Sequence, residues 1–409
     1  MEHLSAYKEE FSILGTTGAL KEVREKGLEE FLSAGFPTPK TEDWRYADLK
    51  LLRKAHLKRA QDKTSNKKIS PLTGWPQIII ENGQIILTPK ALVGVEILTT
   101  PESVEGYQNK GLFDSPLERM NLAFAETCLV IKIKKRTEVP GLEIVFLNTS
   151  ERDEALYLRN LILVEEGAKA NLFIRTLGTT GGTWTNQITN IYLGKNSELA
   201  LIRDFEAADD ALITARDYAA VKAGAIFRAS SLMAGLPSIR YEIETELLGG
   251  TAHTEFSGGL LAGHGETIDV LTRVHHVKGN TTSNQTFKGV AGAKGKTAFQ
   301  GRVRVEQDAQ KIEAHQNCHN LILERTGEAN VKPELLIFAD DVVCSHGATV
   351  GEIDEDALFY MKQRGIPENQ ARGLLVQAFL GEFLEGLNDE KILAHFTAKI
   401  EAWMAGNLK

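Results

Sequence analysis

Short runs of alternating apolar and polar residues fill the middle of this 409-residue chain, from about residue 75 to residue 345. In a clear example, one set of alternate positions is mainly apolar and the other is charged: Tyr241, Ile243, Thr245 and Leu247 against Arg240, Glu242, Glu244 and Glu246. This period of two is typical of a half-buried β-strand. Glycine-bearing turns separate the runs at intervals of roughly 25 to 30 residues: Gly167, Gly194, Gly224, Gly249 and Gly279. Regular spacing of this size predicts a stacked β-solenoid.

A β-sandwich is the rival interpretation, because it also contains many short strands joined by turns. A sandwich of about 270 residues would be unusually large. A solenoid grows by adding coils that contact only their neighbours, so length is no obstacle to it. We therefore expect a mainly β protein with a solenoid core.

Helical patterns flank this core. Val23, Leu28 and Phe31 lie near one face of a predicted N-terminal helix, and the polar stretch of residues 53–66 reads as a solvated connector with little to bury. After Gly351 the helical period returns, with Asp354 as a plausible helix start. The predicted face of the C-terminal helix consists of Ala371, Leu374, Leu375, Ala378, Phe379 and Phe383. We divide the chain into a helical region 1–70, a β core 71–350 and a helical domain 351–409.

Composition and charge exclude several classes of function and cellular location. The formal net charge is -8, so the chain lacks the basic character typical of binding to nucleic acid or an anionic membrane surface. Neither a signal peptide nor a long apolar run is visible, and the three cysteines are too few for a disulfide framework. These features predict a cytoplasmic protein without nucleic-acid or membrane partners.

The strongest local cluster is Cys344 and His346, in the segment FADDVVCSHGATVG at residues 338–351. Residues i and i+2 of a strand share a face, so the thiol and the imidazole can address one metal ion or one sulfur species. Two ligands are too few for a tight site, so others would come from elsewhere in the fold or from a partner, and simple packing is the alternative. Cys318 and His319 are adjacent, which predicts opposite faces of a strand and leaves their metal binding open.

Several enzyme motifs are excluded. The segment GVAGAKGKT at residues 289–297 has the wrong glycine spacing for a phosphate-binding loop and lies between strand-like runs, so we interpret it as a turn between coils. No nucleophile elbow, zinc-protease helix or dinucleotide-binding turn is present. Acidic pairs, such as Asp209 with Asp210 or Asp340 with Asp341, keep open the alternative of a solenoid enzyme that acts on glycans. His275 and His276 are adjacent, so we expect them to face opposite ways.

Three segments resemble the SufB/SufD family: KTEDWRYADLKLL at residues 40–52, FQGRVRVEQDAQKIEAHQ at 299–316, and the long stretch 332–383. The WRYADL and CSHGATVG motifs are similar to those of SufD members. The resemblance implies a right-handed parallel β-helix between helical regions, and a non-catalytic scaffold subunit in iron-sulfur cluster assembly.

The resemblance also implies partners and a site. SufB is expected to pair with the strand region at residues 341–349, and the ATPase SufC to dock at residues 366–383. His346 matches the functionally important histidine of the family and Cys344 its neighbouring cysteine. Iron or a transient iron-sulfur cluster would then be shared with SufB, with no cofactor firmly bound by the isolated chain. A purely architectural subunit without ligands is the alternative, and the isolated chain can be a monomer or a homodimer.

Overall fold

The computed structural model describes residues 2–15, 21–54, 56–61, 63–65, 68–90, 92–99, 115–125 and 128–408. The chain begins with helices α1 (Glu2–Leu14) and α2 (Lys21–Ala34), the 3-10 helix η1 (Glu42–Trp44) and α3 (Lys50–Lys54). Helix α4 (Pro116–Phe124) precedes the main run of strands, and α5 (Glu355–Gln363), α6 (Glu368–Glu385) and α7 (Glu390–Asn407) follow it.

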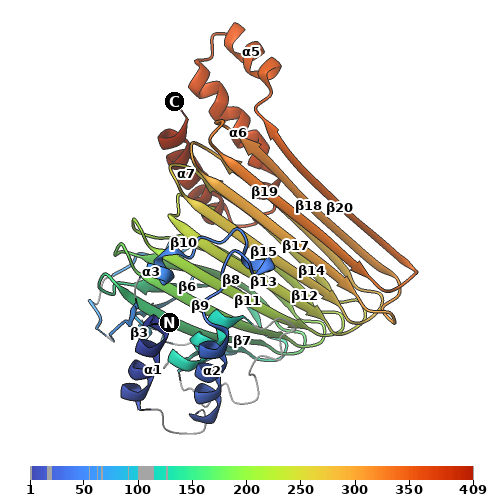
Figure 1. Ribbon diagram of the computed structural model, residues 1–409. Helices are drawn as coiled ribbons and strands as arrows, with labels where there is room; N and C mark the ends of the chain where they lie inside the picture. The colour runs from blue at the N-terminus through green and yellow to red at the C-terminus, as the bar shows by residue number, and fades with distance from the viewer. Residues whose placement is uncertain are drawn as a thin grey trace.

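Two ten-stranded sheets form the centre of the described chain (Figure 1). Sheet A has the order β19 (Glu328–Ile337), β17 (Lys296–Val305), β15 (Thr267–His276), β13 (Ser238–Leu247), β11 (Leu212–Val221), β9 (Trp184–Leu193), β7 (Glu154–Val164), β5 (Cys128–Ile133) and β4 (Val95–Leu98), with β1 (Lys58–Arg59) paired to β7. Sheet B has the order β20 (Val342–Glu352), β18 (Ile312–Ile322), β16 (Thr282–Ala291), β14 (His253–Ala262), β12 (Ile226–Ala234), β10 (Glu198–Glu206), β8 (Lys169–Gly178), β6 (Glu138–Asn148), β2 (Gln77–Glu81) and β3 (Gln84–Leu87).

From β5 to β20, consecutive strands alternate between the two sheets and pair in parallel within each sheet. The chain therefore winds as a coil, with one strand of each sheet in every turn. This arrangement confirms the predicted β-solenoid with helices at both ends and shows that the sandwich interpretation was wrong. None of the helices in the described ranges is long and apolar enough to cross a membrane.

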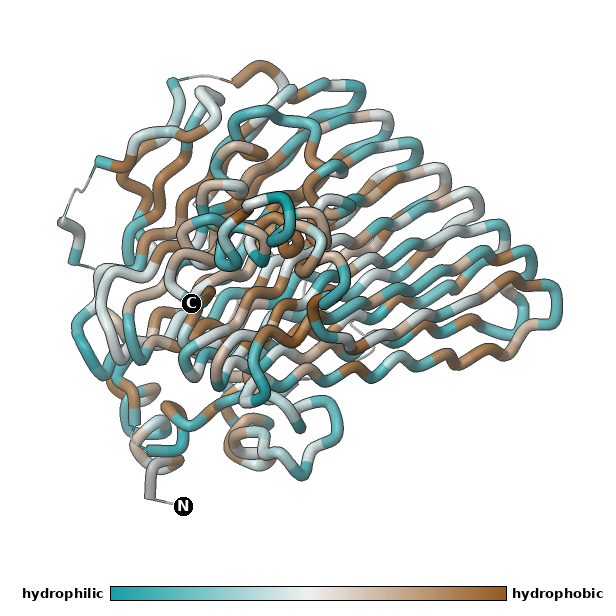
Figure 2. Tube along the Cα trace, turned by 90° about the horizontal axis from the view of Figure 1, so that it is seen from above, coloured by the Kyte–Doolittle hydropathy of each residue, from teal (hydrophilic) through white to brown (hydrophobic). Residues whose placement is uncertain are grey.

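Hydrophobic and hydrophilic residues alternate along the strands of the solenoid (Figure 2). On β13, Ile239, Tyr241, Ile243 and Leu247 belong to the main buried cluster between the sheets. The opposite face of β13 is not exposed to solvent as the alternating pattern predicted, because Arg240 and Glu242 are also buried. Helix α4 and residues near η1 cover this outer face, where the Arg240 guanidinium lies 4.9 Å from the Trp44 ring.

The connector at residues 53–66 buries more than its polar composition predicted. Residues 55, 62 and 66 of it lie outside the described ranges. Among the others, Leu57 and Ala60 are buried, and β1 extends sheet A by pairing with β7. Leu57 and Ala60 flank β1, so this short strand brings two apolar side chains into the core.

The C-terminal helices pack on the outer face of sheet B. Phe383 of α6 and Phe396 of α7 share a buried cluster with Leu232 and Leu261 of the sheet. Asp354 caps α5 by accepting hydrogen bonds from the backbone N–H groups of Asp356 and Ala357, which confirms the predicted helix start. The predicted apolar face of α6 was wrong at two positions, because Leu374 is 42% exposed and Ala378 is also exposed.

Candidate functional site

Strand β20 ends sheet B, and β19 ends sheet A, so the two strands form the open end of the solenoid. Figure 1 shows this end far from α1 and α2. The backbone of β20 pairs with β18 on one side, and among the described residues no strand pairs with its other side. An unpaired strand edge is a template for pairing with another chain.

Apolar side chains are exposed around the open end. Phe338 is 55% exposed in the turn between β19 and β20, and Val343 and Val350 on β20 are 63% and 50% exposed. Leu336 and Ile337 at the end of β19 are also exposed. Scattered exposed apolar residues are ordinary, but a group gathered on a free strand edge indicates an interaction surface.

Cys344 and His346 lie on β20, and their register partners on β18 are Ala314 and Gln316. Ala314 and Gln316 are buried, so this row of β18 faces the solenoid interior, and Cys344 packs against the apolar cluster there. Cys344 is half-buried and His346 is exposed. Burial raises the pKa of the Cys344 thiol, opposed by a hydrogen bond with the Ala314 backbone.

Cys318 and His319 are adjacent on β18, so their side chains lie on opposite faces of the sheet. Cys318 faces the interior, where burial raises the pKa of its thiol to about 12 and Asn320 Nδ2 donates to its sulfur at 3.4 Å. His319 faces outward, with Nδ1 2.9 Å from Thr349 Oγ1. The predicted opposite orientation of these two residues is confirmed. Cys318 thus shares the inner face with Cys344 and His346, whereas His319 does not.

His315 also faces outward on β18. Its Nδ1 lies 2.7 Å from Ser345 Oγ and its Nε2 lies 3.1 Å from Glu313 Oε1. The structure therefore does not bring all the histidines and cysteines of this end into one site. Of the described histidines and cysteines at this end, Cys344 and His346 are the accessible ones on the inner row.

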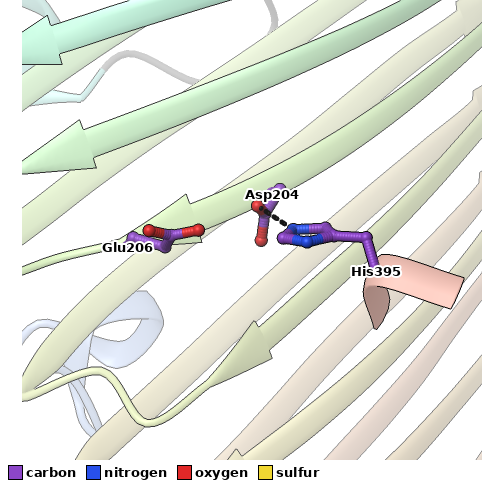
Figure 3. A group of neighbouring side chains, drawn as sticks. All are labelled: Asp204, Glu206 and His395. Atoms are coloured by element: carbon purple, nitrogen blue, oxygen red, sulfur yellow. Dashed lines mark hydrogen bonds and ion pairs between the residues drawn. The ribbon is translucent and has the colours of Figure 1, made fainter. Parts of the chain in front are cut away.

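A different group of potential ligands was not predicted from the sequence. Asp204, Glu206 and His395 bring ligand atoms within 4.8 Å of one another. Figure 3 shows the three side chains, with a dashed line between Asp204 and His395. Asp204 is fully buried, with His395 Nε2 at 2.8 Å and Lys399 Nζ at 2.5 Å. No sequence motif predicts this group, because its members lie on two elements that are far apart in the sequence, β10 and α7.

The charges around Asp204 indicate a structural role. Arg175 Nε lies 3.8 Å from Asp204, and Arg175 Nη2 lies 3.8 Å from Glu206. Burial alone would raise the pKa of Asp204, but the Lys399 ammonium and the hydrogen bond from His395 hold it below its usual range. Two cationic side chains already neutralise the two carboxylates, so the group joins α7 to the solenoid and does not attract a further cation.

Two further sequence interpretations are confirmed. Residues 289–297 span the end of β16, a turn and the start of β17, so they form a turn between coils and open no helix. His276 faces the interior, with Nε2 2.9 Å from Ser283 Oγ, and His275 faces outward, with Nε2 2.6 Å from Glu306 Oε1.

The family model and the most similar known proteins agree on one family. Residues 146–379 match the family model described as SUF system FeS cluster assembly, SufBD core domain. The chain is 26% identical over 398 residues to the iron-sulfur cluster assembly protein SufD of Escherichia coli, covering 93% of this chain and 92% of that protein. It is 25% identical to a SufBD family protein of Synechocystis, covering 94% and 91% of the two chains. It is also 27% identical to the chloroplastic protein ABCI7 of Arabidopsis thaliana, covering 91% and 84%.

Proposed function

The chain belongs to the SufBD family of the SUF iron-sulfur cluster assembly system, and we propose that it is a non-catalytic scaffold subunit that pairs with SufB through the open end of its solenoid. The observation that carries this proposal is the free edge of β20, which presents exposed apolar side chains beside Cys344 and His346. Membership in this family favours an assembly role over the glycan-acting alternative.

The chemistry of the open end suits iron or a nascent cluster as cargo. A thiolate at Cys344 is a soft ligand and the neutral imidazole of His346 a borderline one, a pairing that suits iron. Two ligands do not complete a cluster site, which takes four in most proteins. We therefore assign the remaining ligands to SufB, so that the cargo is held transiently between the subunits and is not retained by this chain alone.

The C-terminal helices offer a second docking surface, which we assign to the ATPase SufC. Phe359 and Tyr360 on α5 are 63% and 59% exposed, and Leu374 on α6 is 42% exposed. Exposed aromatic side chains of this kind are enriched at protein interfaces. Because α6 packs on sheet B, a movement of SufC at these helices would be transmitted to the solenoid.

Pairing through β20 can be tested with edge variants. Val343→Asp places a charge on the free edge, and Ile13→Asp, at a residue that is 86% exposed on α1, is the matched control. Co-expression with SufB and SufC followed by size measurement should show that Val343→Asp loses SufB and that Ile13→Asp retains it. Retention of SufB by the folded Val343→Asp chain would refute pairing through this edge. In the absence of SufB, the same edge supports pairing of two copies of the chain.

A further inference from the structure

A row of buried polar side chains lies inside the solenoid, on the coils that precede the strand carrying His346. Thr272, Gln285 and Gln316 are each at most 1% exposed. Thr272 Oγ1 donates to Gln285 Oε1 at 2.5 Å, and Gln316 Nε2 donates to the same oxygen at 3.5 Å. Gln285 is the register partner of Gln316, and Gln316 is the register partner of His346. The row of polar side chains therefore continues from one coil to the next as far as the open end.

The fold makes room for Gln316 in particular. Gly301 lies on β17, in the facing sheet, and a Cβ atom added there would come within 1.9 Å of Gln316 Nε2. Any other residue at position 301 would displace the amide. The side chain of Gln316 therefore crosses an interior that is otherwise largely apolar, which is costly unless its polar atoms have partners.

One polar atom of Gln316 has no partner among the residues that the structure describes. Its Oε1 is buried and accepts no hydrogen bond, although its Nε2 donates inward to Gln285. Its Oε1 can therefore accept a hydrogen bond from a donor on the coil that follows, which pairs with β18 in register. That coil carries His346, about 4.8 Å away along the sheet. A buried acceptor without a donor in the native chain calls for an explanation.

We propose that Gln316 is the positioning residue of His346: its Oε1 accepts a hydrogen bond from one ring N–H of the imidazole. This bond fixes the tautomer, so that the other ring nitrogen keeps its lone pair and faces outward. Metal-binding histidines commonly have such a carbonyl partner, which sets ring orientation and raises ligand basicity. The role of the outward nitrogen in holding iron rests on the proposed function, whereas the hydrogen bond itself does not.

The test is nitrogen NMR of the isolated chain labelled with ¹⁵N-histidine. In the wild type, His346 should show one dominant tautomer, with a ring N–H protected from exchange with water. Gln316→Leu, which removes the acceptor at similar volume, should abolish both features, and Gln316→Glu, which keeps an acceptor oxygen, should preserve them. Asn317→Leu, on the adjacent outward-facing position of β18, is the matched control and should leave His346 unchanged. The ring signals of His315 and His319 serve as internal references in every variant.

The wild-type spectrum alone decides the matter if Gln316→Leu does not fold. A His346 ring that exchanges between tautomers as free imidazole does, with no protected N–H, overturns the proposal. So does a folded Gln316→Leu chain with an unaltered His346 signature. A second arm measures iron binding by the complex of this chain with SufB and SufC, in which Gln316→Leu should weaken iron affinity about 10- to 100-fold. A fixed tautomer together with normal cluster loading by a His346→Ala complex would reject the proposed function and leave the positioning role standing.

Discussion

His395 on α7 places its Nε2 2.8 Å from Oδ2 of Asp204 on β10, a contact between residues 191 positions apart. Lys399, one turn further along α7, donates to the other oxygen of the same carboxylate. Asp204 is fully buried, so this helix is held to the solenoid by charge as well as by apolar packing.

Replacing Asp204 with Asn should loosen α7. The substitution leaves the Lys399 ammonium without its carboxylate, and breaking a buried ion pair in this way costs about 3 kcal/mol. Denaturant unfolding should show that loss, and limited proteolysis should release C-terminal fragments sooner. Glu401→Gln, which alters an exposed contact of α7 with Gln377, should match the wild type in both assays. Equal stability of Asp204→Asn and wild type would show that α7 is held by apolar packing alone.

Acidification should destabilise the solenoid through His276. Burial, with a smaller contribution from His275, lowers the pKa of His276 to about 3, so the folded state keeps the ring neutral. The unfolded chain gains this proton near pH 6.5, so stability is full above that pH and falls progressively as the pH drops from 6.5 to about 3. At pH 5 the loss from this residue is about 2 kcal/mol.

The check is a comparison of unfolding free energies across this pH range. His276→Gln should flatten the pH dependence between 6.5 and 4, whatever its effect on stability at neutral pH. His264→Gln, at an exposed histidine in the turn between β14 and β15, should retain the wild-type slope. A His276→Gln chain with an unchanged slope would mean that His276 is not the group that titrates.

The three cysteines should react in a fixed order. Burial raises the pKa of the Cys128 and Cys318 thiols to about 12, and both side chains are buried, whereas Cys344 is half-buried on the edge strand. Alkylation with iodoacetamide at pH 8, followed by peptide mass spectrometry, should therefore label Cys344 first. Binding of SufB should protect Cys344, and unfolding in guanidinium should make all three equally reactive. First labelling of Cys318 in the native chain would contradict the placement of this thiol inside the solenoid.

Much of the fold could be predicted because its determinants are local. The alternation on β13 and the glycine-bearing turns each lie within a few residues, and the spacing of the turns reflects the length of one coil. The burial of the outer face of sheet A by α4 and the residues near η1 could not be predicted. Arg273 bonds Asp43 across 230 residues, and a sequence pattern alone gives no sign that a charged strand face will be buried by such a distant segment.

The same distinction applies to the site. The shared face of Cys344 and His346 follows from a period of two, so the sequence was sufficient. The placement of Gln316 beneath His346 depends on the register between β18 and β20, which is set by the turn and the whole of β19 between them. A coil one residue longer or shorter would exchange the inner and outer rows.

The central claim is that His346 takes part in holding iron or the nascent cluster at the SufB interface. The most direct measurement is anaerobic cluster reconstitution of this chain co-expressed with SufB and SufC, with iron, sulfide and complex size determined together. His346→Ala is compared with wild type and with His319→Ala, an outward-facing histidine of the same end. We predict that the His346→Ala complex assembles at normal size but loses iron and sulfide, while His319→Ala loads normally. Normal loading of the His346→Ala complex would contradict the claim and leave this chain an architectural subunit.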